Sequence, residues 1–531
     1  MIFYSNYPLY SAVAKKFTQA YFIERRQSAE EAEGHKGKET DMEEGLKVPA
    51  NLTRRTFVCG MGAVTIMGGL SLAGCSPSKT KSSDKGDAYD IVIIGSGGAG
   101  LSAAIAAFDK GASKIVVLEK MPSTGGNTNF SSSGMNASET KFQKEQGIDD
   151  SNALFAEETL TGGHDTGDAE LVSFMCNGSA GAIDWLDGLG ITLNNITLTG
   201  GMSVKRCHRP TDGSAVGKTL IAGLVEAVKE RKIEVRTNCD AKELVVDGGT
   251  VTGVKVEEKG KQSTLSAKAV IMATGGLGAN QEMVTKYRPD LKGYVTTNQA
   301  GATGDGYAMS EAAGAELVQM DQIQIHPTVE QESSQLIAEG IRGGGAILVN
   351  AEGKRFIDEM KTRDKVSAAE LEQPGGFAWE VFDQTVYDSN KAVANYDKAG
   401  LVKKGDDLAA LASTIGVDAA ALKATVDEYN AVTTSGAADQ MGRTKGCIAF
   451  SDGAMYAIKV APGIHHEMGG VRINTKNEAL SADGKTIPGL YAAGEVTGGI
   501  HGNNRIGGNA VCDIIVFGKN VGEVVADTLS K

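Results

Sequence analysis

Residues 95–100 (GSGGAG) combine residue types and a spacing that suit the binding of a diphosphate. Glycines let the backbone approach a pyrophosphate closely, and the first turn of a following helix offers free N–H groups to the anion. Glu119 lies further along the chain, where an acidic residue accepts hydrogen bonds from ribose hydroxyls. This pattern predicts a dinucleotide site. NAD and FAD both use such a site, so the pattern alone does not distinguish between them.

The elements around this segment form a strand, a helix and a second strand. Residues 89–94 (YDIVII) are apolar and rich in β-branched side chains, which predicts a buried strand. Residues 101–111 (LSAAIAAFDKG) predict a helix that ends at a glycine, and residues 114–118 predict the strand that leads into Glu119. The glycine-rich segment joins the first strand to the helix, which is where a Rossmann-type unit holds its pyrophosphate.

Two later segments repeat the pattern of a buried strand that ends in glycine. Residues 269–273 (AVIMA) run into residues 274–276 (TGG), and residues 489–493 (GLYAA) run into residues 494–495 (GE). Because the carboxyl ends of parallel strands meet at one edge of a sheet, we expect these ends to converge on one extended cofactor. Residues 233–273 also predict a meander of strands with glycine turns.

The composition excludes several classes of protein. The chain has 531 residues, a formal net charge of −13, 69 glycines, 10 prolines and 7 cysteines. Its length predicts about two to three domains of ordinary size. The glycines have no G-X-Y period, which excludes a collagen, and the acidic charge argues against a nucleic-acid partner. No CxxC or CxxCH occurs, so zinc-finger and attached-haem interpretations are excluded and no metal site is predicted.

Residues 1–74 have the layout of an export signal. Arg54 and Arg55 precede an apolar run that starts at Phe57, which resembles a signal of the twin-arginine type. Met42 would give a signal of normal length. We therefore expect either that the true start is Met42 or that the charged region before the signal is unusually long.

The end of this signal looks like a bacterial lipobox. Residues 72–75 (LAGC) would be processed so that Cys75 becomes the lipidated first residue. Residues 75–87 are polar and rich in serine and lysine, which predicts a flexible tether. We expect export by the twin-arginine route and a lipid anchor at Cys75. The chain would then lie on the outer face of the cytoplasmic membrane, at the cell surface or in the periplasm.

Long motifs between residues 89 and 522 resemble, in the same order, the FAD-dependent fumarate reductase and urocanate reductase family of the flavocytochrome c type. The motifs are GGNTNFSSSGMNAS, TNQAGATGDGYAMSEAAGAEL, QIHPT, AILVNAEGKRFIDEMKTRDK, PGIHHEMGGVRI and IPGLYAAGEVTGGIHGNNRIGGNA. The resemblance implies an α/β fold in which a Rossmann-like FAD-binding domain is interrupted by an inserted α+β capping domain. We expect the FAD-binding domain over residues 88–321 and 468–531, and the capping domain over residues 322–467.

The resemblance implies that the dinucleotide is FAD. Members of membrane complexes attach FAD to a histidine, but residues 125–134 contain none, which predicts non-covalent binding. The expected cofactor-binding residues are Gly95, Gly97, Gly98, Ala99, Gly100, Glu119, Lys120, Gly126, Asn127, Thr128, Gly134, Thr274, Gly275, Asp305, Glu495 and Asn509. A second flavin or a haem would act only through a partner. We therefore expect a separate electron donor at the membrane, either a cytochrome or a flavin protein.

The resemblance also implies hydride transfer to one carbon of a C=C bond conjugated to a carboxylate, with a proton added to the adjacent carbon. Such a site needs cations or strong donors at the carboxylate and a positioned acid. His326, His466 and Arg505 match the family's carboxylate ligands. His465, the neighbour of His466, is expected to be structural.

Three further residues match the family's proton delivery. Arg363 matches the proton donor, and Glu339 and Arg342 match a relay that leads protons inward from solvent. An arginine has a pKa above about 12, so its proton must be replaced as soon as it leaves. The i, i+3 spacing of Glu339 and Arg342 places both on one face of a helical turn.

One departure from the family concerns the substrate. Ala338 stands where the family's fumarate reductases carry a threonine that holds the second carboxylate, and Leu336 replaces a methionine that lines the pocket. Losing the hydroxyl weakens the hold on a dicarboxylate. A monocarboxylate acrylate with a bulkier tail, such as urocanate or a cinnamate, is therefore a rival to fumarate. Two other classes stay open: another FAD oxidase or a ketosteroid dehydrogenase on the same fold, and a non-catalytic flavin electron carrier.

Overall fold

A mainly parallel sheet carries the glycine-rich segment. The computed structural model describes residues 88–437 and 439–531, so the predicted signal, tether and lipid site at Cys75 lie outside the described residues. The strand order is β17-β18-β9-β1-β2-β6, and β8 and β7 continue from β9 as an antiparallel meander. The strands are β1 (Ala88–Ile94), β2 (Ile115–Glu119), β6 (Glu234–Thr237), β7 (Cys239–Asp247), β8 (Thr250–Glu258), β9 (Lys261–Met272), β17 (Glu478–Leu480) and β18 (Thr486–Ala492).

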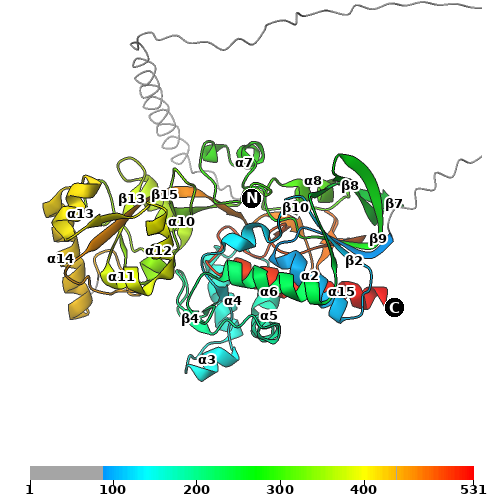
Figure 1. Ribbon diagram of the computed structural model, residues 1–531, viewed down its shortest axis with the longest axis horizontal. Coiled ribbons are helices and arrows are strands. Elements are labelled where there is room, and N and C mark those ends of the chain that lie inside the picture. The colour runs from blue at the N-terminus through cyan, green and yellow to red at the C-terminus, as the bar shows by residue number, and fades with distance from the viewer. Residues whose placement is uncertain (1–87, 438) are drawn as a thin grey trace, which may run out of the picture. The chain divides into compact units, whose positions relative to one another are not determined.

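The centre of this sheet is buried, as its apolar sequence predicts. Residues 91–94 of β1 are at most 5% exposed, which is typical of parallel strands with helices packed on the sheet. Helix α2 (Gly98–Asp109) packs against α6 (Val216–Glu230) and α15 (Asn509–Leu529), as Figure 1 shows. A Cβ on Gly100 would lie 2.0 Å from the carbonyl oxygen of Gly95, so only glycine lets α2 start so close to β1.

Smaller elements surround this sheet. Two three-stranded sheets have the orders β10-β16-β19 and β3-β5-β4. Their strands are β3 (Met135–Asn136), β4 (Asn195–Thr197), β5 (Cys207–Arg209), β10 (Leu317–Val318), β16 (Gly470–Arg472) and β19 (Thr497–Gly498). The helices are η1 (Gly126–Phe130), α3 (Lys141–Glu145), α4 (Asn152–Gly162), α5 (Ala169–Gly188), α7 (Gln281–Tyr287), η2 (Pro289–Leu291) and α8 (Asp305–Ala312).

A second, five-stranded sheet lies within the residues expected to form the cap. Its order is β11-β15-β13-β12, with β14 paired to β15, and every pairing is antiparallel. The strands are β11 (Ile323–Val329), β12 (Ile347–Val349), β13 (Ala378–Asp383), β14 (Lys403–Gly405) and β15 (Met455–Glu467). The helices are α9 (Gly340–Gly343), α10 (Arg363–Leu371), α11 (Gln384–Ser389), α12 (Lys391–Lys398), α13 (Leu408–Ile415) and α14 (Ala419–Ser435).

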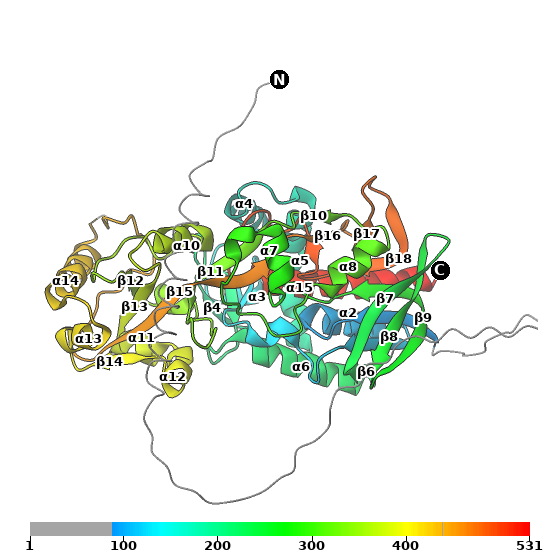
Figure 2. The same cartoon turned by 90° about the horizontal axis from the view of Figure 1, so that it is seen from above.

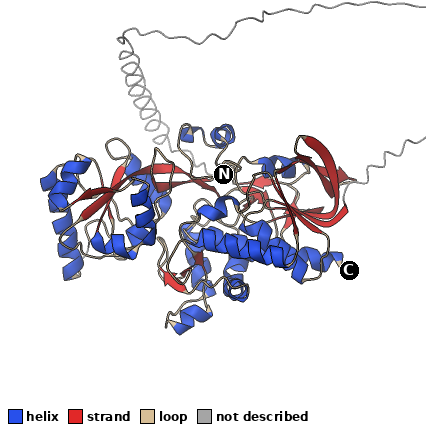
Figure 3. Cartoon of the chain, in the orientation of Figure 1, coloured by secondary structure: helices blue, strands red, loops and turns tan. Residues whose placement is uncertain are grey.

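Each face of the cap sheet has its own apolar core, and helices flank the sheet in Figure 3. One core joins β13 to α9 and α10 through Ile341, Val366 and Phe382. The other joins β13 to α13 and α14 through side chains that include Trp379 and Leu422. Alternation of side chains along β13 therefore decides which core each residue enters.

Strand β15 connects the cap core with the cofactor half of the chain. Its first residues pair with β13 and its last residues pair with β11, and Figure 2 shows β11 and β15 side by side. The α/β fold class with a parallel sheet and a separate antiparallel cap is confirmed, whereas the residue bounds of the domains stay predictions. None of the helices in residues 88–437 and 439–531 has the length and apolar character needed to cross a membrane.

Candidate active site

A cleft with about 830 Å³ of empty space lies at the carboxyl ends of β1, β2 and β9. Helix α2 begins there after Gly97, which offers no side-chain cap, and the Gly98 N–H donates to the Thr128 hydroxyl at 3.1 Å. The other N–H groups of this first turn lie at the cleft, where a helix N-terminus suits a pyrophosphate. The predicted residues that line the cleft are Gly95, Gly97, Gly98, Ala99, Glu119, Lys120, Gly126, Asn127, Thr128, Thr274, Gly275, Asp305 and Glu495. This lining fits a flavin dinucleotide.

Glu119 holds the phosphate turn in place. One carboxylate oxygen accepts hydrogen bonds from the Ser96 amide (3.1 Å) and the Ser96 hydroxyl (2.6 Å), and the other accepts from the Met121 amide (2.8 Å). Each oxygen has more than one lone-pair direction, so the carboxylate keeps acceptor capacity for a ribose. Beside it, Lys120 pairs with Asp305 at 2.6 Å across the cleft.

Three predicted cofactor residues do not line the cleft. Gly100 packs against β1, and a Cβ on Gly134 would meet the backbone of β5 at 2.3 Å. Asn509 is buried at the start of α15, where its side chain bonds to Asn136 and Thr159. Lining residues that the sequence analysis missed include Gln299 and Ala302, which lie within the motif TNQAGATGDGYAMSEAAGAEL, and Ala241 and Ile514, which lie outside the motifs.

A β-bulge in β15 brings His465 to His326. Gln324 of β11 pairs with His466, and the next residue, Ile325, pairs with Ile464, so His465 is the extra residue between the two pairs. The rings of His326 and His465 meet edge to face with their centroids 5.2 Å apart. The structure thus brings together His326 and the histidine that the sequence analysis expected to be structural.

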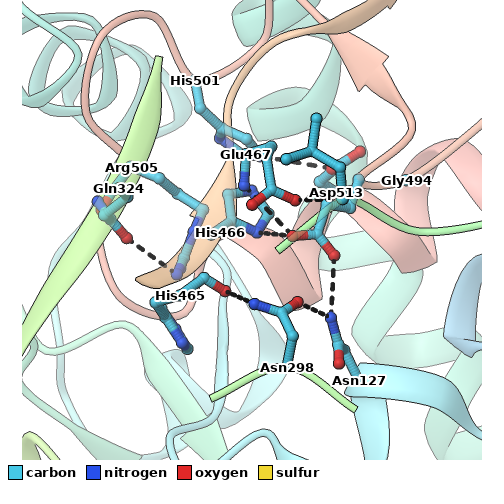
Figure 4. A network of polar contacts seen from close by, with 12 residues as sticks. Asn127, Asn298, Gln324, His465, His466, Glu467, Gly494, His501, Arg505 and Asp513 are labelled. Atoms are coloured by element: carbon cyan, nitrogen blue, oxygen red, sulfur yellow. Dashed lines mark hydrogen bonds and ion pairs between the residues drawn. The ribbon is translucent and has the colours of Figure 1, made fainter. Parts of the chain in front are cut away.

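His466 lies toward the cofactor cleft instead. Its Nδ1 is 3.0 Å from Oε1 of Glu495, a residue that lines the cleft, and Asn127 donates to the other Glu495 oxygen at 3.4 Å. The His466 ring also packs edge to face on His501 at 5.6 Å. Figure 4 shows His466 and Asn127 on one side of this network, and Gln324 and Arg505 on the other.

The predicted proton relay is assembled in one place. Arg363, the first residue of α10, donates from Nη2 to Oε2 of Glu339 at 3.0 Å. Oε1 of Glu339 lies 3.7 Å from Nη2 of Arg342; Arg342 belongs to α9, and Glu339 is the residue directly before this helix. All three side chains are buried, so their charges interact in surroundings that exclude most water.

Gln324 connects Arg363 with Arg505, and the sequence analysis missed it. Its amide oxygen accepts from Arg363 Nη1 at 3.1 Å and from Arg505 Nη2 at 3.2 Å, so one neutral group separates two like charges. Its amide nitrogen donates to the Arg505 carbonyl at 2.8 Å. The i, i+2 spacing of Gln324 and His326 in QIHPT places both on one face of a strand. This spacing could have identified Gln324 as a site residue from the sequence.

Burial and positive charge together set the protonation of this site. Burial and the charge of Arg363 lower the pKa of His326 and of His465 well below the usual value, so both rings are neutral. Burial would raise the pKa of Glu339, but Arg363 and Arg342 hold it below its usual value. Burial, with the charge of Arg363, lowers the pKa of Arg505 to about 9.

This arrangement has free hydrogen-bonding groups for a ligand. Among the described residues, Nε2 of His326, Nε2 of His466, Nε of Arg363 and Nε of Arg505 are buried without a partner. Buried unpartnered groups of this kind call for a ligand or an ordered water. Neutral imidazoles and guanidinium groups suit an anion, and an enclosed site strengthens each contact.

Comparisons with known proteins place this geometry in a family. The FAD binding domain family matches residues 90–511. The chain is 45% identical over 442 residues to a fumarate reductase (cytochrome) of Shewanella frigidimarina, which covers 83% of the chain and 77% of that protein. The chain belongs to the FAD-dependent fumarate reductase family of the flavocytochrome c type.

Two further comparisons agree with this family. A solved open conformation of a flavocytochrome c3 fumarate reductase matches with a TM-score of 0.71 and 42% identity, over 84% of this chain and 79% of that one. An NADH:fumarate oxidoreductase of Klebsiella pneumoniae (strain 342) is 51% identical over 440 residues, which is 82% of this chain but 48% of that protein. The chain thus spans about half of that relative. FAD is the cofactor of the cleft, as the family implies.

Proposed function

We propose that this member of the fumarate reductase family reduces the C=C bond of α,β-unsaturated carboxylates. The observation that carries the proposal is the contact of Arg363 with both Glu339 and Gln324, because it joins a proton relay to the ligands of a carboxylate. The family relationship and the FAD cleft support the same reaction. An electron carrier needs neither the relay nor the buried cationic groups.

The chain's own residues would divide the work as follows. Arg505 and the neutral histidines bind and orient the substrate carboxylate, where negative charge develops during the reaction. Bound FAD supplies the hydride for one carbon of the double bond. Arg363 gives a proton to the adjacent carbon, and Glu339 with Arg342 restores that proton. Burial of these side chains excludes water, which strengthens the hold on the developing charge.

We assign the second carboxylate-binding histidine to His465 and not to His466, the residue matched in the sequence analysis. The ring contact of His465 with His326 supports this assignment. His466 is held by Glu495 at 3.0 Å, so we assign it to the cofactor side. The bulge in β15 explains why adjacent histidines serve different ligands.

Fumarate and urocanate are the candidate substrates. The activities by which the two relatives are named, NADH:fumarate oxidoreductase and fumarate reductase, support fumarate. Ala338 supports a monocarboxylate, since it is buried, offers no hydroxyl, and its amide is taken by the Tyr396 hydroxyl at 3.1 Å. An unpaired buried carboxylate oxygen of fumarate would cost about 1–3 kcal/mol.

The experiment is anaerobic reoxidation of the reduced, purified holoenzyme by fumarate, urocanate, methacrylate and cinnamates. We expect rapid reoxidation by at least one of these compounds. Reoxidation by none of them would refute the proposal and favour the electron carrier. Fast reoxidation by fumarate with little effect of urocanate would refute the argument from Ala338.

We further propose that the protein is exported and lipid-anchored, and receives electrons from a separate cytochrome or flavin protein. Arg54 and Arg55 support export by the twin-arginine route, and Cys75 supports the lipid anchor. The sequence contains no CxxCH motif for an attached haem, which supports a separate electron donor. Fractionation of cells tests the anchor: wild type should sediment with membranes, and Cys75→Ser should not acquire the lipid. Replacement of both arginines by lysine should retain the protein inside the cell.

A further inference from the structure

A buried carboxyl group that the proposed reaction does not use lies behind the wall of the cofactor cleft. Glu467 is the last residue of β15 and is 2% exposed. Its Oε2 accepts a hydrogen bond from the Leu277 amide at 2.7 Å, and its Oε1 has no partner among the described residues. A buried carboxylate oxygen without a donor is unfavourable, so Glu467 calls for a proton or for a further partner.

Glu467 stands beside Glu495, which lines the cleft. The Glu467 amide donates to Oε1 of Glu495 at 3.3 Å. The two carboxyl groups also meet at Gly276, where a Cβ would overlap Oε2 of Glu467 and lie 3.0 Å from Oε1 of Glu495. Figure 4 shows Glu467 in one network with His466 and Asn127. Two carboxyl groups so close to each other favour one shared proton over two negative charges.

Hydrogen-bond donors decide which of the two groups keeps its charge. Oε1 of Glu495 lies 3.0 Å from Nδ1 of His466, and Oε2 accepts from Asn127 at 3.4 Å. Burial would raise the pKa of Glu495, but its contacts with His466 and other donors hold it below the usual value. Burial, with the charge of Glu495, raises the pKa of Glu467 to about 8. At neutral pH Glu467 is therefore protonated and Glu495 is ionised.

The ionisable groups on the elements packed around Glu467 keep one charge state at neutral pH. Burial raises the pKa of Tyr307 well above its usual value, and burial lowers the pKa of His466 to about 4, so both rings are neutral. Arg288 contacts the backbone of β11, the strand paired with the end of β15, and is itself paired with Asp290 at 2.6 Å. None of these three groups supplies Glu467 with a counter-charge.

We propose that Glu467 and Glu495 hold one proton between them and that this proton couples the reduction potential of bound FAD to pH. Two electrons from the donor add negative charge at the cleft, which makes a second charge on the carboxyl pair less favourable. The pair then takes a proton from solvent, and it releases that proton to solvent when the electrons leave. Protons and electrons therefore balance over one cycle, and no bond to the substrate forms or breaks at the pair.

The two residues have different parts in this coupling. Glu495 lines the cleft, and its side chain is 10% exposed, so it gives the pair its contact with solvent. Glu467 does not line the cleft and acts through Glu495, so it is a positioning residue for the charge beside the cofactor. The inference concerns the FAD cleft and needs no particular enoate.

The potential of bound FAD, measured against pH, tests the coupling. Glutamine resembles a protonated glutamate, so Glu467→Gln should match the wild type below about pH 7. Above about pH 8 the wild-type potential should fall below that of the variant, because only the wild type gains a negative charge. Glu380→Gln is the matched control: Glu380 is fully buried in the cap, burial raises its pKa to about 8, and its variant should follow the wild type.

A second measurement identifies the group, because Arg505 also titrates in this range. Burial and the charge of Arg363 lower the pKa of Arg505 to about 9, and Arg505 interacts with Glu495. At about pH 8.5 the infrared difference between reduced and oxidised wild type should show the C=O stretch of a carboxylic acid that gains a proton. The band should be absent in Glu467→Gln and present in Glu380→Gln.

Potentials of the wild type and Glu467→Gln that stay parallel from about pH 7 to about pH 9 would overturn the inference. A wild type without the carboxylic acid band would overturn it as well, even if Glu467→Gln failed to fold. Both measurements use electrochemical reduction of the holoenzyme without an enoate. Failure here therefore leaves the proposed reaction standing, and failure of every enoate to reoxidise the protein leaves this inference standing.

Discussion

Buried carboxyl groups at the edge of the parallel sheet and inside the cap have opposite surroundings. Glu119 accepts three hydrogen bonds from protein donors, whereas Glu370 and Glu380 meet no donor among the described residues. A carboxylate with fixed donors holds a turn in one shape. A carboxyl without donors keeps its proton and can release it to a neighbouring base. The same functional group is thus bound by fixed donors in one region and left without donors in an apolar core in the other.

Replacement of Arg363, the proposed proton donor, should give the largest effect. Arg363→Ala removes the only group of the relay that also contacts Gln324, and we expect turnover to fall about 10⁴-fold. FAD should stay bound, because Arg363 does not line the cofactor cleft. Stopped-flow reoxidation of the reduced variant measures the loss. Reoxidation at near-wild-type rates would show that Arg363 does not supply the proton.

The stability of the cap should depend on pH through Glu380. Its pKa is about 8 when folded and 4.5 as a free group, so the unfolded chain binds fewer protons between these values. The free energy of unfolding should therefore fall with rising pH by about 1.4 kcal/mol for each pH unit in that window. Below pH 4.5 this contribution is fully present. Chemical denaturation of wild type and Glu380→Gln across the window measures it: the variant should lack this slope, and equal slopes would contradict a buried neutral carboxyl.

Removal of the Glu119 carboxylate, which accepts three hydrogen bonds, should weaken the binding of FAD. Glu119→Ala leaves the Ser96 and Met121 amides without their acceptor, so FAD should bind about 10- to 100-fold more weakly. Flavin fluorescence titration of the apoprotein gives the affinity. Glu370→Gln provides the matched comparison and should bind FAD as wild type does. Equal losses in both would mean that the two regions do not differ in the way described above.

The two adjacent histidines should separate binding of substrate from binding of cofactor. His465→Ala should raise KM for the enoate about 10-fold and leave the flavin spectrum unchanged. His466→Ala frees Glu495 and should change the flavin spectrum or affinity with a smaller effect on KM. The opposite pattern would show that His466, and not His465, binds the substrate carboxylate.

Local sequence predicted what depends on near neighbours in the chain. The phosphate turn follows from glycines between a strand and a helix, and the pairing of Glu339 with Arg342 follows from their i, i+3 spacing. The orientation of His465 could not be predicted, because a bulge shifts the alternation of a strand by one residue. The role of Gln324 depends on side chains from α10 and from the loop before α15, which only the fold brings together.

Strand β15 also has a mechanical consequence. One strand of 13 residues is paired to the cap at its start and ends in His465, His466 and Glu467 beside the cofactor. A rotation of the cap would therefore also move His465 and His466 at the other end of this strand. The irregular pairing of β11 with β15, on either side of the Ile325 and His326 pairs, is the place where such a rotation can bend the ladder. The place where the ladder can bend thus includes His326 and His465, the two histidines proposed to bind the substrate carboxylate.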